Sequence, residues 1–276
     1  MLKQLLLFIQ LFIAAVCLAQ NRNDIVIDEM MLDPTPQVGL PNSKWIELRN
    51  TSNSIINLGG WRIGNTAGVM SGSMPAFNLQ PDSCVVICTA TAASELAVFG
   101  NVISVNSFPS LDNTDGKIFL KTPNGRTVHA IEFNNSWYQN AVKSDGGWTL
   151  EMIDVKNPCS GSSNWKASSD KKGGTPGKIN SVNAMNSDNT PPRLLRGFAT
   201  DEFNVTIVFD EPLDSLKASM VNNYSISNGG TVVSVVAIPP FFNRVSLRVS
   251  NAFQSNKVYV ITASGVSDCS GNTISN

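Results

Sequence analysis

The feature of this sequence that most limits its fold is a succession of short segments in which apolar and polar residues alternate. The clearest are Lys117–Lys121 and Thr127–Phe133, which flank the turn Pro123-Asn124-Gly125. Alternation with a period of two places one set of side chains in a core and the other in water, as in a β-strand. Asn-Gly tolerates the positive φ that a tight turn between two strands requires. We therefore predict a β-hairpin over residues 117–133.

Further short segments that read as β-strands, some alternating and some wholly apolar, follow one another along most of the chain. They are Asp24–Asp28, Lys44–Asn50, Ile55–Ile63, Cys84–Cys88, Val205–Phe209, Arg244–Val249 and Lys257–Ala263. We expect only Ala90–Phe99 to form a helix, and a short one. Strands at this spacing, without helical periods between them, predict an all-β protein built as sandwiches or barrels.

The N-terminus has the pattern of a secretory signal peptide. Lys3 supplies a positive start, Leu5–Leu18 is almost wholly apolar, and Cys17-Leu18-Ala19 offers small residues where a signal peptidase cleaves. The apolar run is shorter than the ~20 residues of a membrane-spanning helix. We predict cleavage after Ala19, which makes the mature chain secreted or cell-surface, without a transmembrane segment. Lipidation of Cys17 is the alternative, and the bulky Val16 before it disfavours that reading.

Charge and length narrow the class of protein further. Removal of residues 1–19, whose only charged side chain is Lys3, lowers the formal net charge from −1 to −2 and leaves 257 of the 276 residues. Without a basic surplus to neutralise phosphates, we expect no general nucleic-acid binding. A mature chain of this length predicts two domains. We place them at residues 24–180 and 193–276, with a linker over 181–192 that Pro191-Pro192 stiffens.

Four cysteines follow the predicted cleavage site, at positions 84, 88, 159 and 269. Cys84 and Cys88 lie in one predicted strand, about 13 Å apart at ~3.3 Å per residue, which is too far for a disulfide. Either remaining two-bridge pattern would tie Cys269 to the first domain, which does not suit a flexible pair of independent domains. We therefore predict a single bond, Cys88–Cys159, with Cys84 and Cys269 as buried thiols. Four buried, unpaired cysteines are the alternative.

Several motifs of residues 24–180 resemble the lamin-tail domain of secreted bacterial proteins. They are Trp45-Ile46-Glu47-Leu48-Arg49-Asn50, Leu58-Gly59-Gly60-Trp61, Phe108-Pro109-Ser110-Leu111-Asp112-Asn113, Gly146-Gly147-Trp148-Thr149-Leu150-Glu151, Asn164-Trp165 and Gly173-Gly174-Thr175-Pro176-Gly177. This resemblance implies an immunoglobulin-like β-sandwich without catalytic residues of its own.

The second predicted domain, residues 193–276, resembles a bacterial Ig-like domain of the surface-protein type. The resemblance rests on Val208–Asp214, Tyr224–Ile226 and Val266–Asn272. Together the two resemblances imply an all-β chain of two immunoglobulin-like β-sandwich domains in tandem after an N-terminal signal peptide.

The residues that an enzyme would need lack a catalytic pattern. His129 lies inside a predicted strand, and the sequence holds no Gly-x-Ser-x-Gly elbow, so we interpret it as a partly exposed strand histidine. Glycosidases need two facing carboxylates, and the sequence does not bring the acidic residues together. We interpret these as solvated strand faces and expect no enzymatic activity. They are Asp28, Glu29, Glu47, Glu132 and Glu151.

Three features could contact a ligand. Asp112-Asn113-Thr114-Asp115-Gly116 concentrates oxygen donors, so Asp112 and Asp115 are candidate calcium ligands, although such residues also make ordinary turns. Trp137-Tyr138 stands in a polar stretch and is a candidate exposed aromatic contact, whereas Trp45, Trp61, Trp148 and Trp165 lie in the family-like motifs and are expected in the core. Phe241-Phe242 is a similar candidate in the second domain, with anchoring in its own core as the alternative.

The sequence therefore supports two hypotheses of function. The first is a non-catalytic extracellular or cell-surface module for adhesion or for association with matrix, with extracellular polysaccharide, cell wall or a surface protein as partner. The second is an accessory part of a secreted hydrolase, nuclease-like or other, whose catalytic part lies outside this chain. No cofactor other than calcium is expected under either hypothesis.

Overall fold

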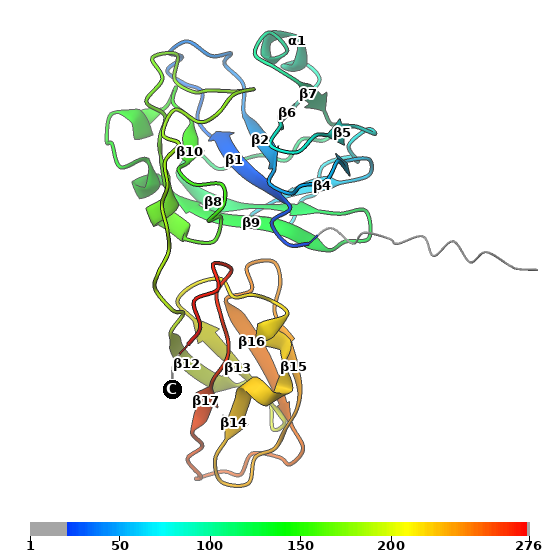
Figure 1. The fold of residues 1–276 in the computed structure, drawn as a ribbon, viewed down its shortest axis with the longest axis vertical. Helices are drawn as coiled ribbons and strands as arrows, with labels where there is room; N and C mark the ends of the chain where they lie inside the picture. Colours follow the sequence, from blue (N-terminus) through cyan, green and yellow to red (C-terminus); the bar gives the residue numbers. More distant parts are fainter. Residues whose placement is uncertain (1–20, 275–276) are drawn as a thin grey trace, which may run out of the picture.

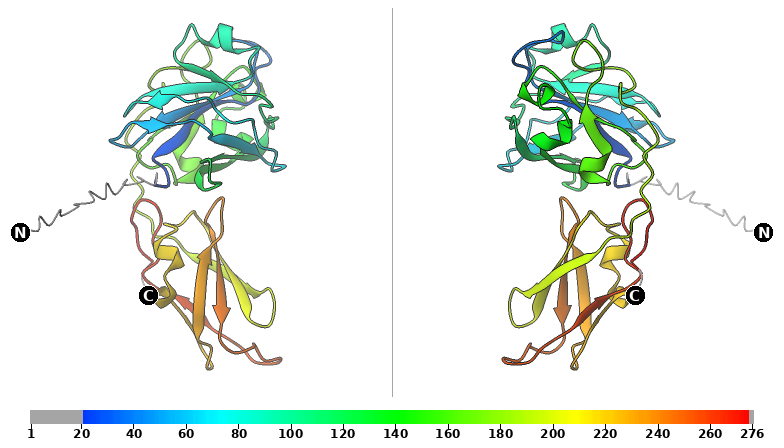
Figure 2. Two further views of the ribbon diagram at one scale, coloured as in Figure 1. Left: turned by 90° about the vertical axis from the view of Figure 1, so that its right-hand side faces the viewer. Right: turned by 90° about the vertical axis from the view of Figure 1, so that its left-hand side faces the viewer.

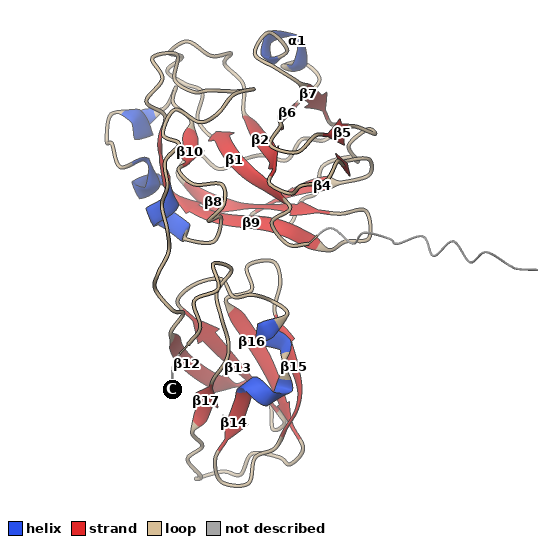
Figure 3. Cartoon of the chain, in the orientation of Figure 1, coloured by secondary structure: helices blue, strands red, loops and turns tan. Residues whose placement is uncertain are grey.

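The computed structural model describes residues 21–274 and is built almost wholly of β-strands (Figures 1 and 3). The predicted signal peptide, residues 1–19, lies outside the described residues. Two hydrophobic cores organise the described chain. One draws its buried residues from Ile25 to Ala167, and the other draws them from Val205 to Val266. We call the parts around these cores the N-terminal unit and the C-terminal unit. The all-β prediction is confirmed.

The N-terminal unit is built around a six-stranded sheet. Its strands, in spatial order, are β11 (Trp165–Ala167), β10 (Leu150–Met152), β1 (Ile25–Met31), β2 (Trp45–Asn50), β6 (Cys84–Cys88) and β7 (Val102–Ser104). All neighbours are antiparallel except β6 and β7, which are parallel. The short helix α1 (Ala93–Leu96) lies within the expected segment between β6 and β7.

Smaller sheets complete this unit. They are β4 (Arg62–Asn65), β8 (Asp115–Lys121) and β9 (Thr127–Asn134) in one sheet, and β3 (Ile56–Asn57) with β5 (Asn78–Leu79) in another. The pair β8 and β9 is the predicted hairpin, in antiparallel register. Single 3₁₀ turns follow β9 or flank β10, at Asn135–Tyr138, Lys143–Asp145 and Gly161–Asn164.

Both faces of the six-stranded sheet are covered, so every residue of its central strands β1 and β2 is buried. One face packs on the main core, which contains Leu48, Trp61 and Trp165. The outer face carries a smaller apolar cluster around Trp45. The sequence predicted both strands, but it could not show that their second face is also buried, because alternation does not reveal what covers the polar positions.

The C-terminal unit is a second sandwich of antiparallel strands. One sheet has the order β12 (Leu194–Ala199), β13 (Asn204–Phe209), β16 (Arg244–Val249) and β15 (Val232–Ala237), and it faces the pair β14 (Tyr224–Ile226) and β17 (Ile261–Ala263). Single 3₁₀ turns lie at Lys217–Ser219 and Val221–Asn223. Arg244 and Arg248 face water as the alternation predicts, whereas the strand expected over 257–263 is limited to β17.

The two units stand end to end, and a disulfide joins them where they meet (Figures 1 and 2). Cys159 of the N-terminal unit is bonded to Cys269 of the C-terminal unit. The predicted Cys88–Cys159 bond is therefore wrong, and so is the expectation that Cys269 is a thiol. Cys84 and Cys88 are buried and form no disulfide with another described cysteine, so the geometric argument against pairing them holds.

Arg22 forms a second tie across the junction. Its guanidinium donates to the carbonyl of Leu213 and lies 4.5 Å from the ring centroid of Phe242. Lys117 approaches the ring of Phe241 at 5.5 Å. The two phenylalanines that we considered as a ligand contact thus meet cationic side chains of the N-terminal unit. None of the helices among residues 21–274 is long and apolar enough to span a bilayer.

Candidate functional site

Three glutamates from adjacent strands form one buried row on the outer face of the six-stranded sheet. Glu47 of β2 pairs in register with Glu29 of β1, which pairs on its other side with Glu151 of β10. Neighbouring strands are ~4.8 Å apart, so side chains at one register lie next to one another. All three are 0 % exposed. The prediction that these residues form a solvated face is therefore wrong, although Glu132 does face water.

Residues 173–182, which we call the strap, cover this row. Each of the three glutamates accepts hydrogen bonds from it. The bonds run from Thr175 N–H to Glu29 Oε1 (2.7 Å), Thr175 Oγ1 to Glu151 Oε1 (2.9 Å), Gly177 N–H to Glu47 Oε2 (2.6 Å), Ser181 Oγ to Glu151 Oε2 (2.7 Å) and Val182 N–H to Glu151 Oε2 (3.2 Å). The carboxyl groups replace a partner strand as acceptors for the buried strap backbone.

A buried ion pair lies at the end of this row. The register of β1 and β2 shifts between Ile27 and Glu29, so Asp28 is the additional residue of a β-bulge. Its carboxylate Oδ2 lies 2.5 Å from Nε of Arg49, and both side chains are buried. Arg49 also donates to the carbonyls of Asp82 and Lys178, which joins the sheet to the strap.

Burial dominates the ionisation of these acids. It raises the pKa of Glu47 to about 8, with a further contribution from the Asp28 charge. Burial also raises the pKa of Asp28 to about 6, although Arg49 opposes that shift. The pKa of Glu29 lies well above its usual value, because of burial and then of the neighbouring Glu47 and Glu151. Taking a carboxylate out of water disfavours its charged form unless donors replace the water.

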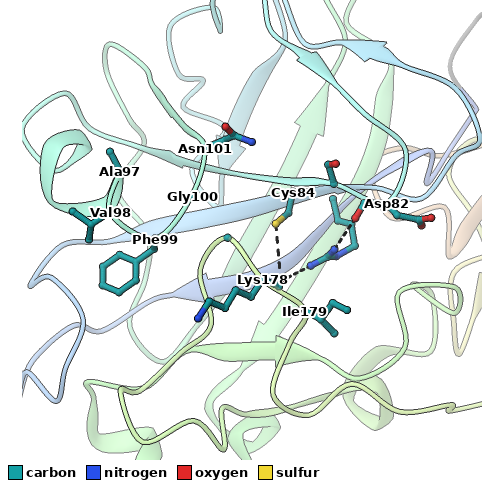
Figure 4. Close-up of a pocket in the computed structure, with 12 residues that line it drawn as sticks. Asp82, Cys84, Ala97, Val98, Phe99, Gly100, Asn101, Lys178 and Ile179 are labelled. Carbon is teal, nitrogen blue, oxygen red and sulfur yellow. Dashed lines mark hydrogen bonds between the residues drawn. The ribbon is translucent and has the colours of Figure 1, made fainter.

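An open groove of about 590 Å³ lies between the loop after α1 and the strap, and Arg49 is one of its lining residues (Figure 4). Arg49, Asp82 and Cys84 come from the sheet side, Ala97–Asn101 from the loop after α1, and Gly177–Ile179 from the strap. Val98 and Ile179 on its rim are 78 % and 68 % exposed. Burial raises the pKa of the Cys84 thiol, so the groove does not offer a reactive thiolate. The groove therefore suits binding through apolar and polar contacts.

The strap closes one side of the groove only because residue 177 is glycine. Its φ is +77°, and a Cβ there would stand 2.2 Å from the carbonyl oxygen of Phe99. We expect Gly177→Ala to displace the strap and to cost about 1–3 kcal/mol of unfolding free energy. Denaturant unfolding of the purified variant measures this loss. Gly125→Ala is the matched control, because Gly125 has φ +82° but open space around it. Equal losses in the two variants would contradict a close contact at the strap.

His129 is placed differently from our prediction. It is 2 % exposed rather than partly exposed, and its Nδ1 accepts a hydrogen bond from the N–H of Ile27 at 3.0 Å. Burial lowers its pKa to about 3. A neutral histidine whose Nδ1 is already engaged by the backbone has a structural role in holding β1 against β9.

The candidate calcium residues lie in an exposed loop that a lysine already contacts. Asp112 accepts from the hydroxyl of Thr66 at 2.6 Å, and Asp115 begins β8. Lys44 donates from its Nζ to the carbonyl of Leu111 at 2.6 Å and also to the side chain of Asn113. Its ammonium therefore takes oxygens that a cation would need. Calcium at Asp112 and Asp115 stays a prediction.

The candidate aromatic contact is largely withdrawn into the core. Tyr138 is 3 % exposed, so its prediction as an exposed contact is wrong. Trp137 is half-buried and lies with its ring 6.1 Å from that of Trp165. Trp45, Trp61 and Trp165 are buried as expected, while Trp148 is partly buried against the core.

A second group of acids lies at the junction of the units. Asp188, Glu211 and Asp268 bring one ligand atom each within 4.8 Å of one another. Burial, with the charges of Asp188 and Asp268, raises the pKa of Glu211 to about 7. Asn272 donates to Asp268 and, through its side chain, to the carbonyl of Asp188. These bonds hold the segment before β12 against the end of the described chain, and we assign the group no ligand.

Comparison with known proteins supports the resemblance of the N-terminal unit. A family model described as Lamin Tail Domain, which has an immunoglobulin-like fold, matches residues 19–135. This match covers β1 to β9, whereas Glu151 and the strap lie beyond it. No curated protein matches the chain. Among solved structures, that of the S-layer protein rSbsC shares 20 % identity with a TM-score of 0.29, over 31 % of this chain and 12 % of that chain.

Proposed function

We propose that the protein is an exported, non-catalytic module that binds or spaces components outside the cell. In this proposal residues 24–180 form a lamin-tail domain and residues 193–276 form a bacterial Ig-like domain, joined by the linker 181–192. The lamin-tail match supports a non-catalytic immunoglobulin-like module for the first of these. Extracellular polysaccharide, cell wall or a surface protein is the expected partner.

The observation that carries this proposal is the junction between the two units. Cys159–Cys269 joins them covalently, and Arg22 reaches from the N-terminal unit to the carbonyl of Leu213. Two sandwiches held in one orientation keep their end loops at a constant separation, which suits a binding or spacing role. A structural disulfide is also typical of exported proteins, in agreement with the predicted signal peptide.

The groove beside the strap replaces Trp137 and Tyr138 as the candidate place of contact. Its rim residues Val98 and Ile179 are apolar and exposed, while Asp82 and Asn101 offer polar groups next to them. Apolar surface with a few directed polar groups is the usual composition of a binding site.

Binding of the mature chain, Gln20–Asn276, to immobilised cell-wall glycans, secreted polysaccharides and DNA tests the proposal. We expect saturable binding to a glycan and none to DNA, and at least a tenfold loss of affinity in Val98→Asp and Ile179→Asp. Val142→Asp is the matched control, since Val142 is also 78 % exposed but does not line the groove. Hydrolysis of any of these polymers would overturn the proposal, and absence of glycan binding would rule out the binding role at the groove and leave only the spacing role.

A further inference from the structure

The strap joins the buried acids to the junction. Its last residues continue into the segment that leads to the C-terminal unit, and Ala184 in that segment donates its N–H to the carbonyl of Ile153 at 3.0 Å. Gly177, Lys178 and Ile179 form one wall of the groove. Any change that releases the strap therefore alters the groove and the attachment of the linker at the same time.

The hydrogen bonds that hold the strap are accepted by buried carboxyl groups that have few cationic side chains near them. Among the salt bridges of the described residues, Arg49 is the cation that contacts this group, and it lies nearest to Asp28. Lys166, opposite Glu151 on β11, and Lys178 of the strap are both exposed. Cys84 of β6 adds a thiol rather than a charge. The four carboxyl groups of β1, β2 and β10 thus face one buried guanidinium.

Two carboxyl oxygens of the row, Glu29 Oε2 and Glu47 Oε1, are buried and accept no hydrogen bond from the residues that the structure describes. Glu47 Oε1 lies 3.7 Å from Nη2 of Arg49, whereas no salt bridge of the described residues reaches Glu29. An ionised oxygen in such a place loses its hydration without a replacement, so a proton there is favoured. Glu29 and Glu47 are paired in register on adjacent strands, so ionisation of both would also make the two carboxylates repel each other.

We propose that the strap, residues 173–182, is a proton-controlled latch over the Glu47–Glu29–Glu151 row. It is closed while Glu29 and Glu47 hold protons, and it opens when both are ionised. This inference rests on the contacts of the strap and is independent of the proposed binding function. In the folded protein the pKa of Glu47 is raised above its usual 4.5 to about 8. Protonated Glu47 therefore contributes to the unfolding free energy in full below pH 4.5, and this contribution is lost as the pH rises towards 8.

Hydrogen exchange of the mature chain at pH 5, 7 and 9, corrected for the intrinsic exchange rate, tests the latch. We expect the protection of peptides from residues 173–182 to fall at least tenfold between pH 5 and 9. Peptides from β16 in the other core are the internal reference and should keep their protection. Constant protection of the strap, or an equal fall in β16, would overturn the proposal.

Amide variants separate the latch from general unfolding. Glu29→Gln keeps the oxygen that accepts from Thr175 but cannot ionise, so the strap of this variant should remain protected at pH 9. Glu47→Gln is the second variant, for which we expect the same result. Glu132→Gln removes an exposed acid and should respond to pH as the wild type does. A wild-type pH response in both Glu29→Gln and Glu47→Gln would refute control by this row.

Discussion

Replacing both Cys159 and Cys269 by alanine is expected to lower the unfolding free energy by about 3–5 kcal/mol. The bond closes a loop with a sequence separation of 110 residues, so its loss returns a large conformational freedom to the unfolded chain. It also removes the covalent tie between the two cores. Denaturant unfolding of wild type and double variant, monitored by tryptophan fluorescence and circular dichroism, measures the difference.

Reductant supplies the control for this prediction. Under reducing conditions the wild type should fall to the stability of the double variant, while the double variant should not respond. Cys84→Ala controls for the loss of a buried thiol, because Cys84 forms no bond to either residue. If the wild type kept its full stability with the bond demonstrably reduced, Arg22 and the other junction contacts would suffice to hold the units together.

Alternation along the chain was enough to predict most strands but not what covers them. The hairpin of β8 and β9 was predictable because alternation and Asn-Gly act within seventeen residues of sequence. Trp45–Asn50 alternates equally well, and the pattern correctly groups Glu47 with Arg49 on one face. It could not show that this face is covered, because the cover is the strap, more than a hundred residues further along the chain.

The errors at the candidate site have the same physical origin. Asn134 to Ser136 are polar, which suggested exposure of the next two residues. In the structure Asn134 caps a 3₁₀ turn by accepting from the N–H of Ser136, and the turn directs Tyr138 inward. The disulfide was misassigned because we assumed two independent domains. The observed bond exists because the junction brings Cys159 and Cys269 to a Cα separation of 6.0 Å.

One signal in the sequence could have indicated the buried row. Gly173-Gly174-Thr175-Pro176-Gly177 offers little side-chain bulk, which allows its backbone to approach a sheet closely. In the structure a Cβ on Gly174 would stand 2.8 Å from Oε1 of Glu29. A glycine-rich segment together with glutamates at the centres of strands therefore indicates a backbone that is held by carboxyl acceptors.

Replacing Arg49 by methionine is expected to lower the unfolding free energy by about 3–5 kcal/mol at pH 7.5, because it leaves Asp28 buried without its counter-ion. Methionine keeps much of the aliphatic stem, so the change removes charge and donors rather than packing. Arg193→Met is the matched control. It breaks a pair of the same type, Nε to Oδ2 of Asp210 at 2.8 Å, in which Arg193 is 77 % exposed, and its loss of unfolding free energy should be far smaller because water screens this pair.

The pH dependence of the unfolding free energy lost in Arg49→Met shows whether Arg49 acts through its charge or through the hydrogen bonds that it donates. The pKa of Asp28 is raised to about 6 even beside Arg49. The protonated form of Asp28 therefore contributes to the unfolding free energy in full below pH 3.8, and this contribution is lost as the pH rises through 6. Without Arg49 the folded pKa rises further and this loss continues to higher pH. The difference between wild type and variant should therefore grow from pH 4 to pH 7.5. The hydrogen bonds that Arg49 donates to the carbonyls of Asp82 and Lys178 contribute equally at pH 4 and pH 7.5.

A difference between wild type and variant that does not change with pH would assign the whole role of Arg49 to those two hydrogen bonds. In that case Asp28→Asn in the Arg49→Met background should restore none of the lost unfolding free energy.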